Sequence, residues 1–102
     1  MATFTFITDY QGGTYISQQK ADDLLSACYC WRDHVLSGNY IQNLEPDQFA
    51  STFNTDIEEL PPVAIDDVIN VWLFQLFISG SILNLHIILT SLSASNGDGG
   101  KI

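Results

Sequence analysis

The residues of this chain that could carry chemistry are few, and the first pair is Cys30 and His34. They lie four positions apart, which on a helix brings a thiol and an imidazole base within reach of each other. A histidine near a helix end is equally well explained by its interaction with the helix dipole. Cys28 falls on the apolar side of that segment, and His86 lies within a run of strand-forming residues. We therefore predict no catalytic residue and expect that the protein is not an enzyme.

Metal and phosphate sites have sequence signatures that this chain lacks. The acidic stretches DIEE and NGDGG do not alternate oxygen ligands in the order of a calcium loop. The pair Gly12-Gly13 joins two predicted strands rather than preceding a helix, so it does not predict a phosphate-binding loop. Cys28 and Cys30 point to opposite sides of a helix, which disfavours both a disulfide and a shared metal ion. We predict no cofactor and no metal.

Composition and charge restrict the class of protein. The 102 residues suffice for one domain, and 46% hydrophobic with 15% charged residues is typical of a folded chain. Twelve Asp and Glu against three Lys and Arg give a net charge of −9, which repels phosphate backbones. We therefore predict no nucleic-acid partner. A surface of this sign fits a basic protein partner, and it is equally typical of a protein that is merely kept soluble.

One uncharged stretch raises the question of a membrane segment. Residues 68–94 contain no Asp, Glu, Lys or Arg and are long enough to span a bilayer as a helix. Asn70, Gln75 and Asn84 are unfavourable in hydrocarbon, and the β-branched and aromatic content favours strands. We predict a buried hairpin and no membrane association. The lack of a leader pattern predicts a cytoplasmic protein.

The N-terminal segment TFTFITDYQGGTYISQ alternates apolar and polar residues on either side of two glycines. This pattern predicts a β-hairpin whose two-residue loop begins at Gln11 or Gly12. Either loop places Ile16 on the same sheet face as Ile7 and collects the aromatic residues on the opposite face. That aromatic face needs a covering layer.

A long amphipathic helix is predicted next, with Ser17 as its N-cap and Gly38 as its terminator. Its apolar positions form one continuous stripe: Ala21, Leu24, Leu25, Cys28, Trp31 and Val35. Residues 39–67 then predict a short helix beginning at Pro46, followed by an acidic loop. Pro61-Pro62 opposes regular structure within that loop.

The sequence VWLFQLFISGSILNLHIILT predicts a second hairpin with a two-residue loop beginning at Ser79 or Gly80. In the first case Gln75 lies opposite Asn84, and in the second it lies opposite His86. Residues 91–102 are typical of a flexible tail.

Together these elements predict one α+β domain over residues 1–90, a two-layer sandwich of order β-β-α-(short α)-β-β. A four-stranded antiparallel sheet is covered on one face by the long helix, and large apolar residues on its other face predict self-association as a homodimer. The predicted self-association face comprises Ile7, Ile16, Val71, Leu73, Gln75, Phe77, Ile82, Asn84, His86 and Ile88. The alternative is that the segment carrying Phe49, Phe53, Ile57 and Leu60 folds back over this face within the monomer.

The most polarised segment runs from residue 45 to residue 67 and contains no Lys or Arg. We predict that its acidic side chains bind a basic partner: Glu45, Asp47, Asp56, Glu58, Glu59, Asp66 and Asp67. The leading hypothesis is a small cytosolic module that acts by protein–protein binding, in one form an immunity or antitoxin protein that occludes a basic toxin. The alternative is a small-ligand-binding or catalytic protein with a pocket between sheet and helix, near Tyr10, Tyr15 and Trp31.

Overall fold

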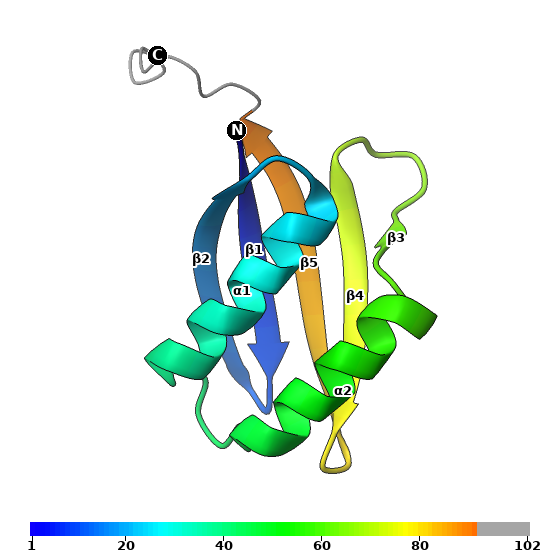
Figure 1. The fold of residues 1–102 in the computed structure, drawn as a ribbon. Coiled ribbons are helices and arrows are strands. Elements are labelled where there is room, and N and C mark those ends of the chain that lie inside the picture. The colour runs from blue at the N-terminus through cyan, green and yellow to red at the C-terminus, as the bar shows by residue number, and fades with distance from the viewer. Residues whose placement is uncertain (92–102) are drawn as a thin grey trace.

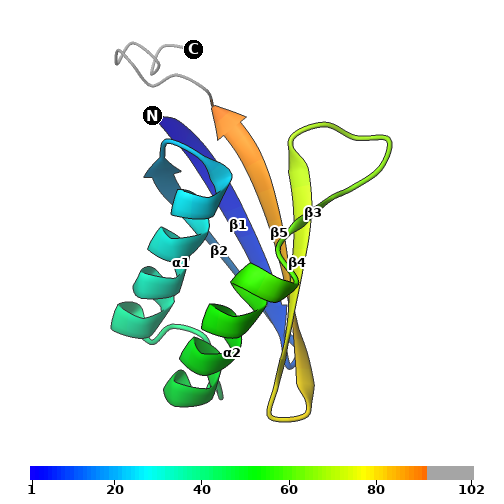
Figure 2. The ribbon, with the colours of Figure 1, turned by 45° about the vertical axis from the view of Figure 1, so that its right-hand side comes forward.

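Five strands and two helices make up the fold in the computed structural model, which describes residues 1–91. In chain order they are β1 (Ala2–Tyr10), β2 (Gly13–Ala21), α1 (Leu24–Gly38), α2 (Pro46–Glu59), β3 (Val63–Ala64), β4 (Val71–Ile78) and β5 (Ser81–Ser91). The strands form one antiparallel sheet of order β2-β1-β5-β4-β3. Both helices lie on the same face of this sheet (Figure 1), and the turned view shows no helix on the other face (Figure 2).

The predicted α+β class with an antiparallel sheet is confirmed, but the count of elements was wrong in two places. The sheet has five strands rather than four, because Val63 and Ala64 pair with Leu73 and Trp72 as the short strand β3. Two long helices, rather than one, cover the sheet. The predicted tail, residues 91–102, lies outside the described residues apart from Ser91, the last residue of β5.

Both hairpin loops have a tight two-residue turn. Tyr10 pairs with Gly13 and Ile78 pairs with Ser81, so the loops are Gln11-Gly12 and Ser79-Gly80. All four loop residues have positive φ, between 48° and 82°, as type I′ turns require. The turn that begins at Ser79 fixes the register in which Gln75 faces Asn84.

The start of α1 differs from the prediction. Ser17 is not a helix cap, because it pairs with Phe6 in β2, and that strand continues to Ala21. The ladder with β1 overrides the weak local preference of the intervening polar residues. The helix begins instead after Asp23, whose carboxylate accepts a hydrogen bond from the Ser26 N–H (2.8 Å) and thereby lowers the pKa of Asp23.

The predicted short helix is a full one, and the acidic loop begins later than expected. Glu45 caps α2 by accepting from the Gln48 N–H (3.0 Å), and the helix continues to Glu59. Phe49, Phe53 and Ile57 follow each other at intervals of four residues and are all buried. Their shared stripe holds the helix on the sheet as far as its last turn.

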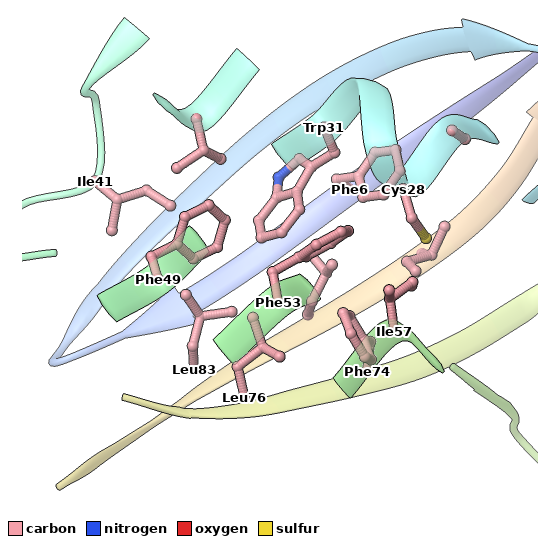
Figure 3. Packing of buried hydrophobic residues seen from close by; sticks show 14 of the residues in the cluster. Phe6, Cys28, Trp31, Ile41, Phe49, Phe53, Ile57, Phe74, Leu76 and Leu83 are labelled. Carbon is pink, nitrogen blue, oxygen red and sulfur yellow. The ribbon is translucent and has the colours of Figure 1, made fainter. Parts of the chain in front are cut away.

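The core lies between the sheet and the two helices, and aromatic rings dominate its centre (Figure 3). The Trp31 indole of α1 stacks on Phe6 of β1, with ring centroids 5.8 Å apart. It also meets Phe49 edge-on at 5.5 Å, and Phe53 contacts Phe74 of β4 at 5.7 Å. These contacts connect both helices to the same face of the sheet.

This arrangement contradicts the alternative in which the segment of α2 covers the opposite face. Phe49, Phe53 and Ile57 are buried beneath α2, on the side of the sheet that α1 also covers. Leu60 is exposed at the end of the helix. No helix within residues 1–91 covers the remaining face, which we call the open face.

The burial of Phe53 generates a stability prediction. Phe53→Ala removes a fully buried ring and should lower the free energy of unfolding by about 3–5 kcal/mol. The matched variant is Phe77→Ala, whose ring is exposed on the open face, and it should lower that free energy by less than about 1 kcal/mol. Urea unfolding at low protein concentration measures both values. Equal losses in the two variants would contradict the packing of α2 against the sheet.

Candidate interaction surfaces

The open face is built by the alternation of side chains along the strands. Because Phe4, Phe6 and Thr8 of β1 are buried beneath the helices, Ile7 points to the opposite side. The registers of the four strand pairs place one side chain from every strand in a single row: Ile16, Ile7, His86, Leu73 and Val63. This row crosses the whole sheet and is apolar except for His86.

The apolar side chains of this face are exposed to different degrees. Ile16 and Phe77 are 66% and 64% exposed, and Ile82, which faces Phe77 across the strand pair, is 49% exposed. The other predicted apolar members are half-buried by their neighbours: Ile7, Val71, Leu73 and Ile88. Val63 is 67% exposed and belongs to the same row, but sequence reasoning missed it because β3 is too short to show a period.

A polar row runs parallel to the apolar one. The Gln75 amide donates to the Asn84 side-chain oxygen (2.6 Å), and the Thr14 hydroxyl donates to the Asp9 carboxylate (2.7 Å). Asp9 and Asn84 are themselves register partners. His86 is not part of this row, because it lies between Ile7 and Leu73. The polar groups of the open face therefore bond largely to one another.

Charge is distributed unequally between the two layers. The five strands contain only two residues of the types Asp, Glu, Lys and Arg, namely Asp9 and Lys20. The other acidic residues of the described chain lie in the helices, their caps and the connecting segments. The open face is thus close to neutral on a protein whose net charge is −9.

The predicted acidic surface is divided between the two ends of α2 and the following turn. Glu45 and Asp47 lie at the start of α2, where a carboxylate interacts favourably with the helix dipole. Asp66 and Asp67 lie in the turn between β3 and β4. Glu45 and Asp47 therefore lie at the opposite end of α2 from Asp56, Glu58 and Glu59.

The acidic residues at the end of α2 are in an unfavourable place. Asp56, Glu58 and Glu59 lie in the last turn, at the negative end of the helix dipole, and no basic residue accompanies them. The one ion pair within residues 1–91 joins Arg32 to Asp33 (2.9 Å). Helix stability does not account for these three carboxylates.

The outer edge of β4 is only partly covered by β3. The Ile65 N–H donates to the Val71 carbonyl (3.0 Å), so the backbone groups of Val71 point away from β5. This direction repeats at every second residue of an antiparallel strand, so Leu73, Gln75 and Phe77 share it. Pairing with β3 ends at Leu73, which leaves Gln75 and Phe77 without a strand partner on that side.

Two adjoining grooves flank this free part of the edge. The larger, of ≈ 590 Å³, is lined by Glu59, Leu60, Pro61, Pro62, Val63, Leu73 and Gln75. The smaller, of ≈ 230 Å³, is lined by Asp56, Leu60, Gln75, Leu76, Phe77 and Ile82. Because both include Leu60 and Gln75, the two grooves are continuous along the edge of β4. Each also contains one carboxylate.

The residues that could do chemistry are not assembled into a site. Cys28 is fully buried, and burial raises the pKa of its thiol to about 12. Cys30 and His34 are both exposed, and the His34 ring packs against Tyr40 with centroids 5.0 Å apart. Within residues 1–91 no three His, Cys, Asp or Glu side chains are grouped to hold a metal ion.

The region proposed for a ligand pocket is occupied by protein. Tyr10 and Trp31 are buried in the core, and the Tyr15 hydroxyl accepts a hydrogen bond from the Gln42 N–H (3.1 Å). The grooves described above lie elsewhere, at the edge of β4. Among the described residues, neither helix has the length and apolar character needed to cross a bilayer.

Comparison with protein-family models, curated proteins and solved structures finds no match to this chain.

The two cysteines generate a prediction about reactivity. At pH 8 a thiol whose pKa is about 12 is ionised in about one molecule in ten thousand, so Cys28 should not react in the folded protein. One fast thiol, that of Cys30, is expected with a chromogenic disulfide reagent, and a second only after denaturation. The variant Cys30→Ser should show no fast thiol. Two fast thiols in the native protein would contradict the packing of α1.

Proposed function

We propose that this protein is a small binding module that forms a homodimer through its open face. The observation that supports the proposal is the combination of exposed apolar residues and low charge on that face. A second copy of a chain with a net charge of −9 can approach with little repulsion only where carboxylates are scarce. Interface centres are likewise depleted in charged residues. Catalysis has no part in this proposal.

The apolar surface available for burial sets the expected strength of the dimer. Ile16, Val63, Phe77 and Ile82 are each about half or more exposed, and covering each contributes about 1–2 kcal/mol. The half-buried side chains add a smaller amount, for a sum of about 5–10 kcal/mol per protomer face. A dimer covers two such faces, so burial contributes about 10–20 kcal/mol, and association costs about 4–15 kcal/mol of this. The dimer is therefore expected to be weak and reversible.

The polar residues of the face are suited to fix how two copies align. The Gln75–Asn84 pair is already bonded within the protomer, so covering it leaves few unpaired groups. His86, in the middle of the apolar row, supplies a polar atom close to this pair. A two-fold arrangement brings the same residues of both copies together and makes the face self-complementary.

The acidic residues support a second partner on the helix side. Five of them lie on α2 and its cap, so a basic protein can bind there while the open face is occupied. An immunity or antitoxin protein is one specific form of such a module. A cytosolic setting is part of the proposal and agrees with two free cysteines.

Sedimentation equilibrium tests the dimer, starting at about 1 mM protein and diluting to about 10 µM. The mass should fall from near twice the chain mass of 11.3 kDa toward that mass. Ile16→Asp places a charge in the apolar row and should give the monomer mass throughout, with an unchanged circular dichroism spectrum.

The control is Leu25→Asp, which changes a side chain that is 50% exposed on α1. It should dimerise like the unmodified protein. A monomer at every concentration, or equal loss in both variants, would refute self-association through the open face.

A further inference from the structure

The free edge of β4 exists because of the residues that follow α2. If β3 continued backwards along β4, Pro62 and Pro61 would come to lie beside Phe74 and Gln75. A proline has no N–H to donate to a sheet, so pairing stops at Val63 and the chain turns away to the helix layer. The N–H and C=O groups of Gln75 and Phe77 are consequently left for another strand.

This edge lacks the features that usually protect exposed strands. Natural edges carry lysine, proline or inward-pointing charges that prevent pairing with other chains. The outer edge strand β2 has Gln18, Gln19 and Lys20 at one end. The free part of β4, from Gln75 to Ile78, contains no charge and no proline. Of the two edges, that of β4 is open to strand addition.

The grooves beside this edge offer places for side chains on both sides of an added strand. On the helix side, Leu60 and Leu76 line the smaller groove. On the open-face side, Phe77 and Ile82 line the same groove. Because side chains of a strand alternate between two faces, successive residues of an added peptide would enter these two places in turn.

The charge beside the grooves decides which partner fits. Asp56 and Glu59 line the grooves, and Glu58 lies beside them in a helix turn that has no basic residue. A second copy pairing edge to edge would bring these carboxylates against their own equivalents, which is unfavourable. A peptide with lysine or arginine would instead neutralise them and the negative end of the α2 dipole.

We propose that the edge of β4 at Gln75–Phe77 binds an extended, basic peptide segment of a partner protein as an additional strand, in line with β3. Backbone hydrogen bonds to Gln75 and Phe77 hold the segment. The apolar groove takes its aliphatic side chains, and Asp56 and Glu59 pair with its basic ones. The inference rests on the proposed role as a binding module and adds the outer edge of β4 to it; the groove shares Phe77 and Ile82 with the open face.

The probe is a fluorescently labelled peptide of alternating lysine and valine, blocked at both ends, with binding followed by fluorescence anisotropy. The unmodified protein should bind it, and a matched peptide of alternating glutamate and valine should not bind. Two N-methylated versions carry the methyl groups on the lysines or on the valines. Strand addition requires that one version binds about tenfold more weakly than the other, because alternate N–H groups face β4.

Two pairs of variants locate the site. Gln75→Pro removes an outward N–H without breaking the ladder to β5 and should weaken binding about tenfold, whereas Gln75→Ala keeps the N–H and should bind normally. Asp56→Asn with Glu59→Gln should weaken binding at least about fivefold. Asp22→Asn with Asp33→Asn removes the same charge at two residues that line neither groove and should have less than about a twofold effect.

Several results would overturn the inference. The inference is wrong if the lysine–valine peptide does not bind. It is also wrong if both N-methylated peptides bind equally well, because charge alone would then account for the binding. The N-methylated pair remains decisive if Gln75→Pro fails to fold. Sedimentation of the same samples separates the two proposals. If the protein forms a dimer but does not bind the peptide, the proposed function stands and strand addition is refuted.

Discussion

The aromatic contacts of Trp31 are the constraint on which the rest of the structure depends. One indole touches Phe6 of the sheet and Phe49 and Phe53 of α2, so it fixes both helices to one side. Arg32 reinforces this contact: its guanidinium lies over the Phe53 ring and donates to Asn54 of α2 (3.0 Å). Because both helices pack on that side, no helix within residues 1–91 covers the other face of the sheet. The open face is therefore a consequence of how the core packs.

The same division of layers separates the charges. The strands contain almost none, whereas the helices and turns carry the acidic residues that give the protein its negative charge. A neutral apolar face and an acidic helix side match the two partners proposed above, a second copy of the chain and a basic protein. At the edge of β4 the two environments meet, because Phe77 and Asp56 line one groove. That edge is where backbone pairing, apolar burial and charge can act on a single partner.

Much of this architecture could be predicted from sequence because its signals are local. Alternation and the loop glycines located both hairpins, and Gly80 limited the register to two choices. The errors arose where distant contacts decide the structure. Ser17 is in β2 because β1 pairs with it, and α2 extends to Glu59 because Ile57 reaches the core. The period of four from Phe49 to Ile57 was visible in the sequence and could have shown the longer helix.

The surfaces were predictable to a different extent. The residues of the open face could be predicted, because alternate residues of a strand point to the same face and this alternation is visible in the sequence. The division of the acidic segment depends on where α2 ends, and the groove at β4 depends on how Leu60 and Pro61 leave the sheet. Neither has a local signature. Val63 belongs to the open face because of a strand of only two residue pairs, Val63 with Leu73 and Ala64 with Trp72.

Methyl nuclear magnetic resonance with a soluble paramagnetic probe tests the central claim most directly. At low concentration the probe should strongly broaden the methyl signals of Ile16 and Ile82 and spare those of Ile57 and Ile87, which are buried. At high concentration Ile16 and Ile82 should become protected as a second copy covers them. If these two isoleucines are already protected in the dilute protein, or stay accessible at every concentration, the open face is not the surface through which this protein binds itself.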